Sequence, residues 1–297
     1  MTEETNGSTV PRRSLGLALE SARKRAGFTM QQAADRVGVS VQTIRRVERG
    51  EVSTRPSLVE VLCEFYDIPK PMRDVLIGLA KESKSRGWWH SYGDVIPRWF
   101  ELYVSLEQTA RRIREFAPQL VPGLVQHSDY TGLVIRIDLP HLGDEEVSAR
   151  IKLRQERQQL LTRSFPAPPE VEVIISEAVL LGEPTADGVM RSQVWHLLKA
   201  TELPTVTLRV LPLRAGPHRS SASGGWTLMD FSSENGYNTP PSTVYSEDVT
   251  GAIYLDKPSE IETYEEVWAA LDRAALDQTE SIELMSQRLK ELTDREA

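Results

Sequence analysis

The chain has 297 residues, of which 40% are hydrophobic, so it is long enough for two domains with buried cores. Its one cysteine, Cys63, excludes an internal disulfide and fits a reducing compartment. No apolar run approaches the roughly 18 residues of a membrane span, and the polar first residues lack the apolar core of a signal peptide. We therefore expect a cytoplasmic protein.

The charge is unevenly distributed. The formal net charge is -8, yet residues 12–68 hold ten Lys and Arg against seven Asp and Glu. Such an asymmetry favours a basic module that meets a polyanion. Many acidic proteins contain a slightly basic segment, so the asymmetry alone does not identify the partner.

Residues 14–68 predict a compact set of short helices. Thr29 and Gly38 bound one of them, and Ser40 and Gly50 bound the next. Ser and Thr suit the first position because their oxygens accept the unpaired amide bonds of the first turn. Gly suits the last because it reaches positive φ without steric cost. Two such helices joined by a tight turn predict a helix-turn-helix.

The rest of the chain predicts a mixed α/β region after a connector with one helix. An apolar stripe from Phe100 to Ile113 predicts a helix. Further helices are expected at 128–139, 144–163, 188–201, 259–276 and 278–293, and strands at 171–176, 206–213, 225–231, 243–248 and 252–256. The predicted class is thus multidomain: an all-α helix-turn-helix domain, followed by a mixed α/β domain with a helical carboxy terminus.

The second short helix, within GVSVQTIRRVERG at 38–50, concentrates arginines on its polar side. Ile44 and Val47 point to one side of a helical wheel. A solvated surface would explain a polar outer side, but the second helix of a helix-turn-helix enters the major groove. Arginine there donates to guanine and glutamine to adenine, while phosphate contacts add salt-dependent affinity. The candidates for base edges are Gln42, Thr43, Arg45 and Arg46, flanked by Val41, and those for phosphates are Ser40, Arg49 and Arg55.

Residues 14–68 resemble the XRE-type helix-turn-helix of phage-repressor-like regulators, carried by LGLALESARKRAGFTMQQAADRVGVSVQTIRRVERG. This resemblance implies binding to double-stranded DNA, and a structural salt bridge between Arg23 and Glu48. The family often has glutamine where this chain has Met30 and Val41, so its operator is not carried over. Because such units usually read paired half-sites, we expect a homodimer.

Residues 88–290 resemble the large carboxy-terminal domain of actinobacterial helix-turn-helix regulators, through LEQTARRIREFAPQLVPGLVQHSDY, RIKLRQERQQLL and VEVIISEAVL. These regulators are antitoxin-like and include WhiJ-like developmental regulators. Their genes are commonly paired with one for a small partner protein, so the resemblance implies a partner-binding second domain. The domains expected are a disordered tail at 1–12, the DNA-binding domain at 13–70, a connector at 71–98 and the regulatory domain at 99–297.

Two other functions compete. A one-component regulator would use the second domain to sense a small molecule, for which its tryptophans offer aromatic surface. An enzyme is the remote alternative. We expect no catalytic residue, metal or cofactor, because the histidines lack metal-ligand spacing and a site built from Glu177, His218 and Glu247 has no support in spacing.

Arg150, Arg154 and Arg157 lie at helical spacing and form a possible partner or anion site. A salt-bridged structural helix is the favoured interpretation, with Glu107, Glu177 or Glu247 as the answering carboxylates.

Overall fold

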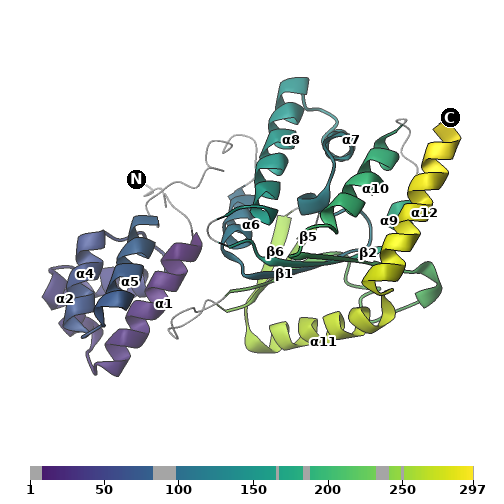
Figure 1. The fold of residues 1–297 in the computed structure, drawn as a ribbon. Helices are drawn as coiled ribbons and strands as arrows, with labels where there is room; N and C mark the ends of the chain where they lie inside the picture. The colour runs from purple at the N-terminus through teal and green to yellow at the C-terminus, as the bar shows by residue number, and fades with distance from the viewer. Residues whose placement is uncertain are drawn as a thin grey trace. The chain divides into compact units, whose positions relative to one another are not determined.

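The computed structural model describes residues 9–82, 98–164, 167–182, 188–231, 241–248 and 251–296. They belong to two compact units, and the second carries a β-sheet (Figure 1). The first unit comprises residues 1–93, 100–109 and 231–240, and the second comprises residues 94–99, 110–230 and 241–297. The predicted class is confirmed: an all-α helix-turn-helix region precedes a mixed α/β region that ends in helices.

The first unit is built from short amphipathic helices around one apolar core. Leu15, Leu19, Ile44, Val47 and Leu62 are each buried in this core, because they recur at spacings that place them on the inner side of their helices. The helices are α1 (Thr9–Arg25), α2 (Met30–Val37), α3 (Val41–Glu48), α4 (Pro56–Phe65) and α5 (Lys70–Glu82), and most of α6 (Arg98–Thr109) also belongs to this unit.

The helices of the first unit extend beyond residues 13–70 at both ends. Helix α1 begins at Thr9, within the segment expected as a tail, and its Arg12 is buried. Helix α5 packs on α1 and α4, and its Leu76 and Ala80 are buried in the common core. The domain therefore extends past residue 70 through α5, because its core needs that helix. Residues 1–8 and 83–97 lie outside the described residues.

The second unit is organised around one six-stranded sheet in the order β3-β2-β1-β4-β5-β6. Strands β1, β2 and β3 run parallel, which requires the long helical crossovers that the chain supplies, whereas β4, β5 and β6 follow as antiparallel neighbours. The strands are β1 (Arg112–Ala117), β2 (Glu170–Ser176), β3 (Val206–Leu211), β4 (Trp226–Asp230), β5 (Thr243–Asp248) and β6 (Gly251–Leu255).

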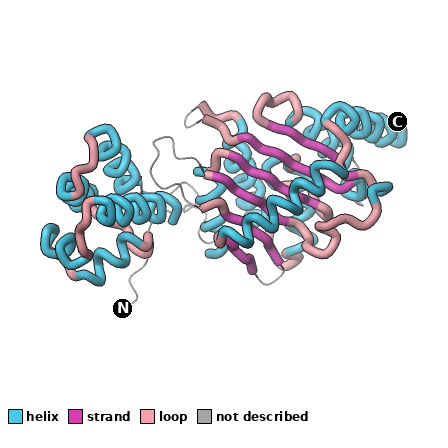
Figure 2. Tube along the Cα trace, turned by 90° about the horizontal axis from the view of Figure 1, so that it is seen from below, coloured by secondary structure: helices cyan, strands magenta, loops and turns pink. Residues whose placement is uncertain are grey.

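Helices cover both faces of this sheet, α7, α8 and α10 on one and α11 on the other (Figure 1). Figure 2 shows α11 crossing the strands obliquely, and its Val267, Trp268 and Leu271 pack against Phe116 and Trp226 of the strands. The helices of this unit are α7 (Ser128–Asp138), α8 (Asp144–Gln158), α9 (Glu177–Leu181), α10 (Val189–Ala200), α11 (Pro258–Ala274) and α12 (Gln278–Glu296).

The helix predicted from the stripe between Phe100 and Ile113 is wrong at its end. Helix α6 stops at Thr109, and Ile113 lies in β1, between Val171 of β2 and Met229 of β4. The charged residues of 112–117 are spaced like the polar side of a helix. In the structure this segment pairs with β2 on one side and β4 on the other, so it is a central strand.

The two edges of the sheet differ. At the β3 edge, Val210 donates its N–H to Ser281 Oγ (3.0 Å) and accepts from Leu276 N (2.9 Å). Helix α12 and the turn that precedes it thus satisfy backbone groups that an edge strand leaves open. At the β6 edge, Ile253 is 60% exposed.

Within the described parts of the chain, every helix is too short or too polar to cross a bilayer.

Arg114 ties α11 to the sheet from a central position in β1. Its side chain is almost fully buried and donates to both carboxylate oxygens of Glu265 on α11, at 2.6 and 2.8 Å, and to Asp230 at 2.7 Å. The hydrogen bonds from Arg114 hold the pKa of Glu265 below its ordinary value, although partial burial opposes them. Glu265 and Asp230 together compensate the buried charge of Arg114. An isolated buried charge would instead lower the free energy of unfolding, because its loss of hydration would not be offset.

We predict that this tether weakens in acid. A carboxylate with a depressed folded-state pKa contributes stability above its unfolded pKa, ordinarily near 4.5, and loses that contribution as the pH falls through the folded value. Glu265→Gln should therefore lower the free energy of unfolding at pH 7, and the difference from the unaltered protein should shrink below about pH 4. Urea titrations across this range provide the measurement.

Glu262→Gln is the matched control, because Glu262 is an exposed carboxylate on the same helix. A difference that persists unchanged at low pH, or that Glu262→Gln reproduces, would contradict the proposed role of the Arg114 pair.

Candidate nucleic-acid interface

The turn between α2 and α3 is fixed by capping bonds at the expected residues. Thr29 Oγ1 accepts the N–H of Gln32 at 3.2 Å, while the side chain of Gln32 accepts the N–H of Thr29 at 2.8 Å. Gly38 ends α2 with φ +69°, a conformation that costs glycine little. Ser40 Oγ then accepts the N–H of Thr43 at 3.1 Å and begins α3. These bonds set the angle at which α3 leaves the turn.

Helix α3 buries one side and presents the other. Ile44, Val47 and Glu48 are buried. Of the residues predicted to contact DNA, Ser40, Gln42, Arg45, Arg49 and Arg55 are exposed, while Val41, Thr43 and Arg46 are half-buried. Val41 packs against the apolar core, so its side chain has less surface to offer a base than the others.

The chain reverses directly after α3. Gly50, with φ +67°, donates its N–H to Val47 O, and Glu51 donates its N–H to Arg46 O at 2.9 Å. This pair of bonds is a Schellman motif, which satisfies the last carbonyls of the helix. It also fixes the backbone of Glu51 beside the basic end of α3.

The side of α3 that faces the core is anchored by an ion pair with α1. Arg23 Nε donates to Glu48 Oε1 at 2.6 Å and Nη2 to Oε2 at 2.8 Å, and both side chains are buried. Arg23 Nη1 also donates to the carbonyl of Phe28, at 2.9 Å. The hydrogen bond with Glu48 raises the pKa of Arg23 above its ordinary value, although burial opposes it. The pair expected between Arg23 and Glu48 is thus bidentate and links the first and third helices.

Gly16 allows α1 and α3 to approach each other closely. A Cβ at this position would lie 2.5 Å from the carbonyl oxygen of Glu48 and 2.6 Å from that of Val47. Both obstacles are backbone atoms of α3, which cannot move as a flexible side chain does. The glycine is therefore needed for its lack of a side chain, within a helix that otherwise disfavours it.

Another set of candidate residues, the arginines of α8, packs onto the loop that precedes α7. Arg157 is buried, with guanidinium nitrogens 3.4 and 3.5 Å from where a Cβ on Gly123 would lie. Arg154 donates to the side-chain oxygen of Gln126. Arg150 is half-buried, and burial lowers its pKa. Arg154 and Arg157 thus contact the loop, through Gln126 and beside Gly123.

Sequence reasoning missed three glutamines that hold this loop. Gln126 donates to Val121 O at 2.6 Å, Gln158 donates to Gln126 O at 2.7 Å, and Gln193 donates to Val125 O at 2.9 Å. Their amides pair with backbone groups of an irregular segment, which burial would otherwise leave unsatisfied. Nothing in a single sequence marks them, because a glutamine on a helix usually faces solvent.

The residues considered for catalysis have structural contacts in the described chain. Glu177 accepts the N–H of Leu213 at 2.7 Å, and Glu247 accepts the hydroxyl of Tyr245 at 2.8 Å. The ring of His218 lies edge-on to Phe116. Burial raises the pKa of the Cys63 thiol to about 11, so it stays protonated in the core. Among the described residues, no group of three or more His, Cys, Asp or Glu side chains has a geometry for a metal.

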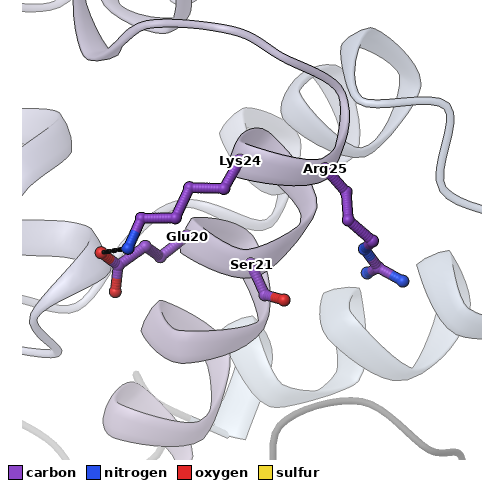
Figure 3. A pocket seen from close by; sticks show the side chains of 4 residues that line it. All are labelled: Glu20, Ser21, Lys24 and Arg25. Carbon is purple, nitrogen blue, oxygen red and sulfur yellow. Dashed lines mark ion pairs between the residues drawn. The ribbon is translucent and has the colours of Figure 1, made fainter.

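A shallow depression lies on the last turns of α1, lined by Glu20, Ser21, Lys24 and Arg25 (Figure 3). Lys24 points across to Glu20, with an Nζ–Oε1 distance of 2.8 Å. This i, i+4 ion pair is solvent-exposed and stabilises the helix only slightly. The depression adds no ligand chemistry to the interface formed by α2 and α3.

Two protein-family models match the chain, one in the helix-turn-helix region and one in the region that contains the sheet. A family model described as Helix-turn-helix domain matches residues 14–76, and one described as Domain of unknown function (DUF5753) matches residues 100–287. The first match indicates a DNA-binding regulator and reaches into α5, while the second description states no activity. No curated protein and no solved structure matches the chain.

We predict that the Arg23–Glu48 pair is required for stability of the first unit. Glu48→Ala leaves a buried, uncompensated guanidinium and should cost about 3–5 kcal/mol in the free energy of unfolding. The loss should appear in thermal and urea unfolding of that unit, and DNA binding should fall only in step with it. Glu51→Ala, at an exposed carboxylate nearby, is the stability control. A Glu48→Ala variant of unchanged stability but weak DNA binding would refute this role.

Proposed function

Since the chain belongs to the DUF5753 family and also carries a helix-turn-helix domain, we propose that it is a sequence-specific transcriptional regulator that binds double-stranded DNA. The observation that carries the proposal is the outer side of α3. Gln42, Arg45 and Arg49 are exposed there, on a helix whose opposite side is fixed to the core by Glu48. A rigid helix with outward arginines and glutamine has the chemistry to read base edges in a major groove.

Within this interface the residues have two roles. Gln42, Thr43, Arg45 and Arg46 contact base edges, with Val41 beside them at the start of the helix. Ser40, Arg49 and Arg55 contact phosphates, which fix register without specifying sequence. Two copies read paired half-sites, so the regulator acts as a homodimer in the nucleoid.

The second unit, in the same proposal, binds a small protein encoded nearby, as in antitoxin-like and WhiJ-like regulators. Trp195 of α10 supports a protein partner, because it is 50% exposed and tryptophan is enriched at interface hot spots. Lys199 Nζ lies 5.8 Å from the centroid of its ring and 2.7 Å from Glu202 Oε1, so this surface combines an apolar ring with a paired cation and carboxylate. Arg150, the half-buried arginine of α8, is a second candidate contact for an acidic partner.

A small-molecule sensor is the alternative role for this unit. Its candidate site is a depression of about 440 Å³ at the start of α11, lined by Pro241, Ser242, Asp256, Pro258, Ile261, Glu262 and Glu265. The depression is open to solvent, whereas small-molecule sites usually enclose most of the ligand surface. We therefore favour the partner protein.

Two variants of α3 test the DNA interface. Arg46→Ala should lower specific affinity by about 1–3 kcal/mol if Arg46 makes a bidentate base contact. Arg49→Ala should weaken specific and non-specific binding alike and reduce the salt slope by about one. Titrations of a selected duplex and a scrambled duplex at several salt concentrations measure both. Unchanged affinity in both variants would remove α3 from the interface.

Co-purification from the native host tests the partner. The full-length protein should retain one small protein encoded near its own gene, and Trp195→Ala should reduce the amount retained because the anchor is lost. A fragment of residues 1–82, which contains the whole core of α1–α5, should retain none. Capture by that fragment would leave the second unit without the proposed role.

A further inference from the structure

Glu51 stands out on the DNA interface because it is an acidic side chain between two arginines. Its Oε2 lies 3.9 Å from Nε of Arg46, and its Oε1 lies 3.7 Å from Nη1 of Arg49. The Schellman bonds after α3 fix its backbone, so this placement does not depend on a chance side-chain rotamer alone. All three side chains are at least 38% exposed.

Glu51 attracts both arginines over distances of 3.7 and 3.9 Å. Both distances are too long for hydrogen bonds, so the attraction is electrostatic and leaves room for a stronger partner. At physiological salt, charges are screened beyond about 8 Å, and both arginines lie well inside that range. Exposed pairs of this kind add little to folding stability, which points to an effect on what the arginines bind.

Glu51 contacts the two arginines at different atoms, Nε of Arg46 and Nη1 of Arg49. This difference leaves different nitrogens of each arginine available to DNA. Glu51 lies nearest Nε of Arg46, and a guanidinium can donate two bonds to guanine through its terminal nitrogens. The carboxylate therefore braces Arg46 in a manner compatible with base readout. At Arg49, by contrast, Glu51 lies nearest the terminal Nη1, where a phosphate would also bind.

We propose that Glu51 is a positioning and specificity-determining residue of the DNA interface, which braces Arg46 for a base and competes with phosphate for Arg49. This inference rests on the proposed DNA-binding function. Non-specific complexes depend on phosphate contacts, so a fixed negative charge beside them weakens non-specific binding. In the specific complex, the base contacts of Arg46 offset the affinity that the weaker phosphate contact loses. Glu51 thus raises the ratio of specific to non-specific affinity.

The experiment compares the full-length protein with Glu51→Gln on two duplexes of equal length. One duplex is selected by the unaltered protein from a randomised pool, and the other is its scrambled sequence. Glu51→Gln should bind the scrambled duplex about three- to tenfold more tightly, with a salt slope steeper by about one, as expected for one additional phosphate contact. Its preference for the selected duplex should fall by about tenfold, the effect of losing part of a bidentate base contact.

Two further variants isolate the cause. Glu60→Gln removes the same charge from an exposed position on α4 and should leave the specificity ratio unchanged. In an Arg46→Ala background, Glu51→Gln should still strengthen binding to the scrambled duplex but should no longer change the preference at the base pair that Arg46 reads. Circular dichroism and thermal unfolding establish that each variant is folded.

Two outcomes are decisive and distinguishable. If the unaltered protein prefers its selected duplex but Glu51→Gln has the same specificity ratio, or Glu60→Gln lowers it equally, the role of Glu51 is wrong and DNA recognition stands. If the unaltered protein selects no duplex from the pool, the proposed function fails, and the role of Glu51 fails with it.

Discussion

The buried ion pair between Arg23 and Glu48 is the interaction on which the orientation of α3 depends. It connects the last turns of α1 and α3 by two charge-assisted hydrogen bonds, at 2.6 and 2.8 Å. A bidentate pair fixes direction as well as distance, because the guanidinium and carboxylate planes must align. The exposed side chains of α3 therefore depend for their direction on two buried residues of the core.

Much of the first unit could be predicted from its sequence because its signals are local. Thr29, Gly38 and Ser40 bound their helices through bonds to residues within four positions, and the structure shows those bonds. The end of the domain could not be predicted in the same way. Leu76 and Ala80 join the core through contacts with distant helices, and a stretch rich in Pro and Lys around residue 70 resembles a linker.

The second unit shows the same division between local and distant causes. The β-branched run of β2 predicted a buried strand, and it is one. Strand β1 was missed because Arg112, Arg114 and Glu115 alternate with apolar residues at a spacing that also fits a helix. Only the partners distinguish the two structures: Arg112 contacts Glu172, and Arg114 contacts Glu265, 60 and 151 residues away. Gln158 and Gln193, which support the loop before α7, were missed for the same reason, because their partners lie 32 and 68 residues away.

Gly16 has a consequence for how this recognition unit can change over evolution. The carbonyl oxygens of Val47 and Glu48 lie within 2.6 Å of the position that a Cβ on α1 would occupy. The last turn of α3 therefore rests directly on the backbone of α1, with no side chain between them to repack. Substitutions of the outward residues of α3 therefore change the chemistry of its exposed side, while the distance between α3 and α1 stays constant. A contact made through side chains would couple these two properties, because a substitution there would also change the spacing of the helices.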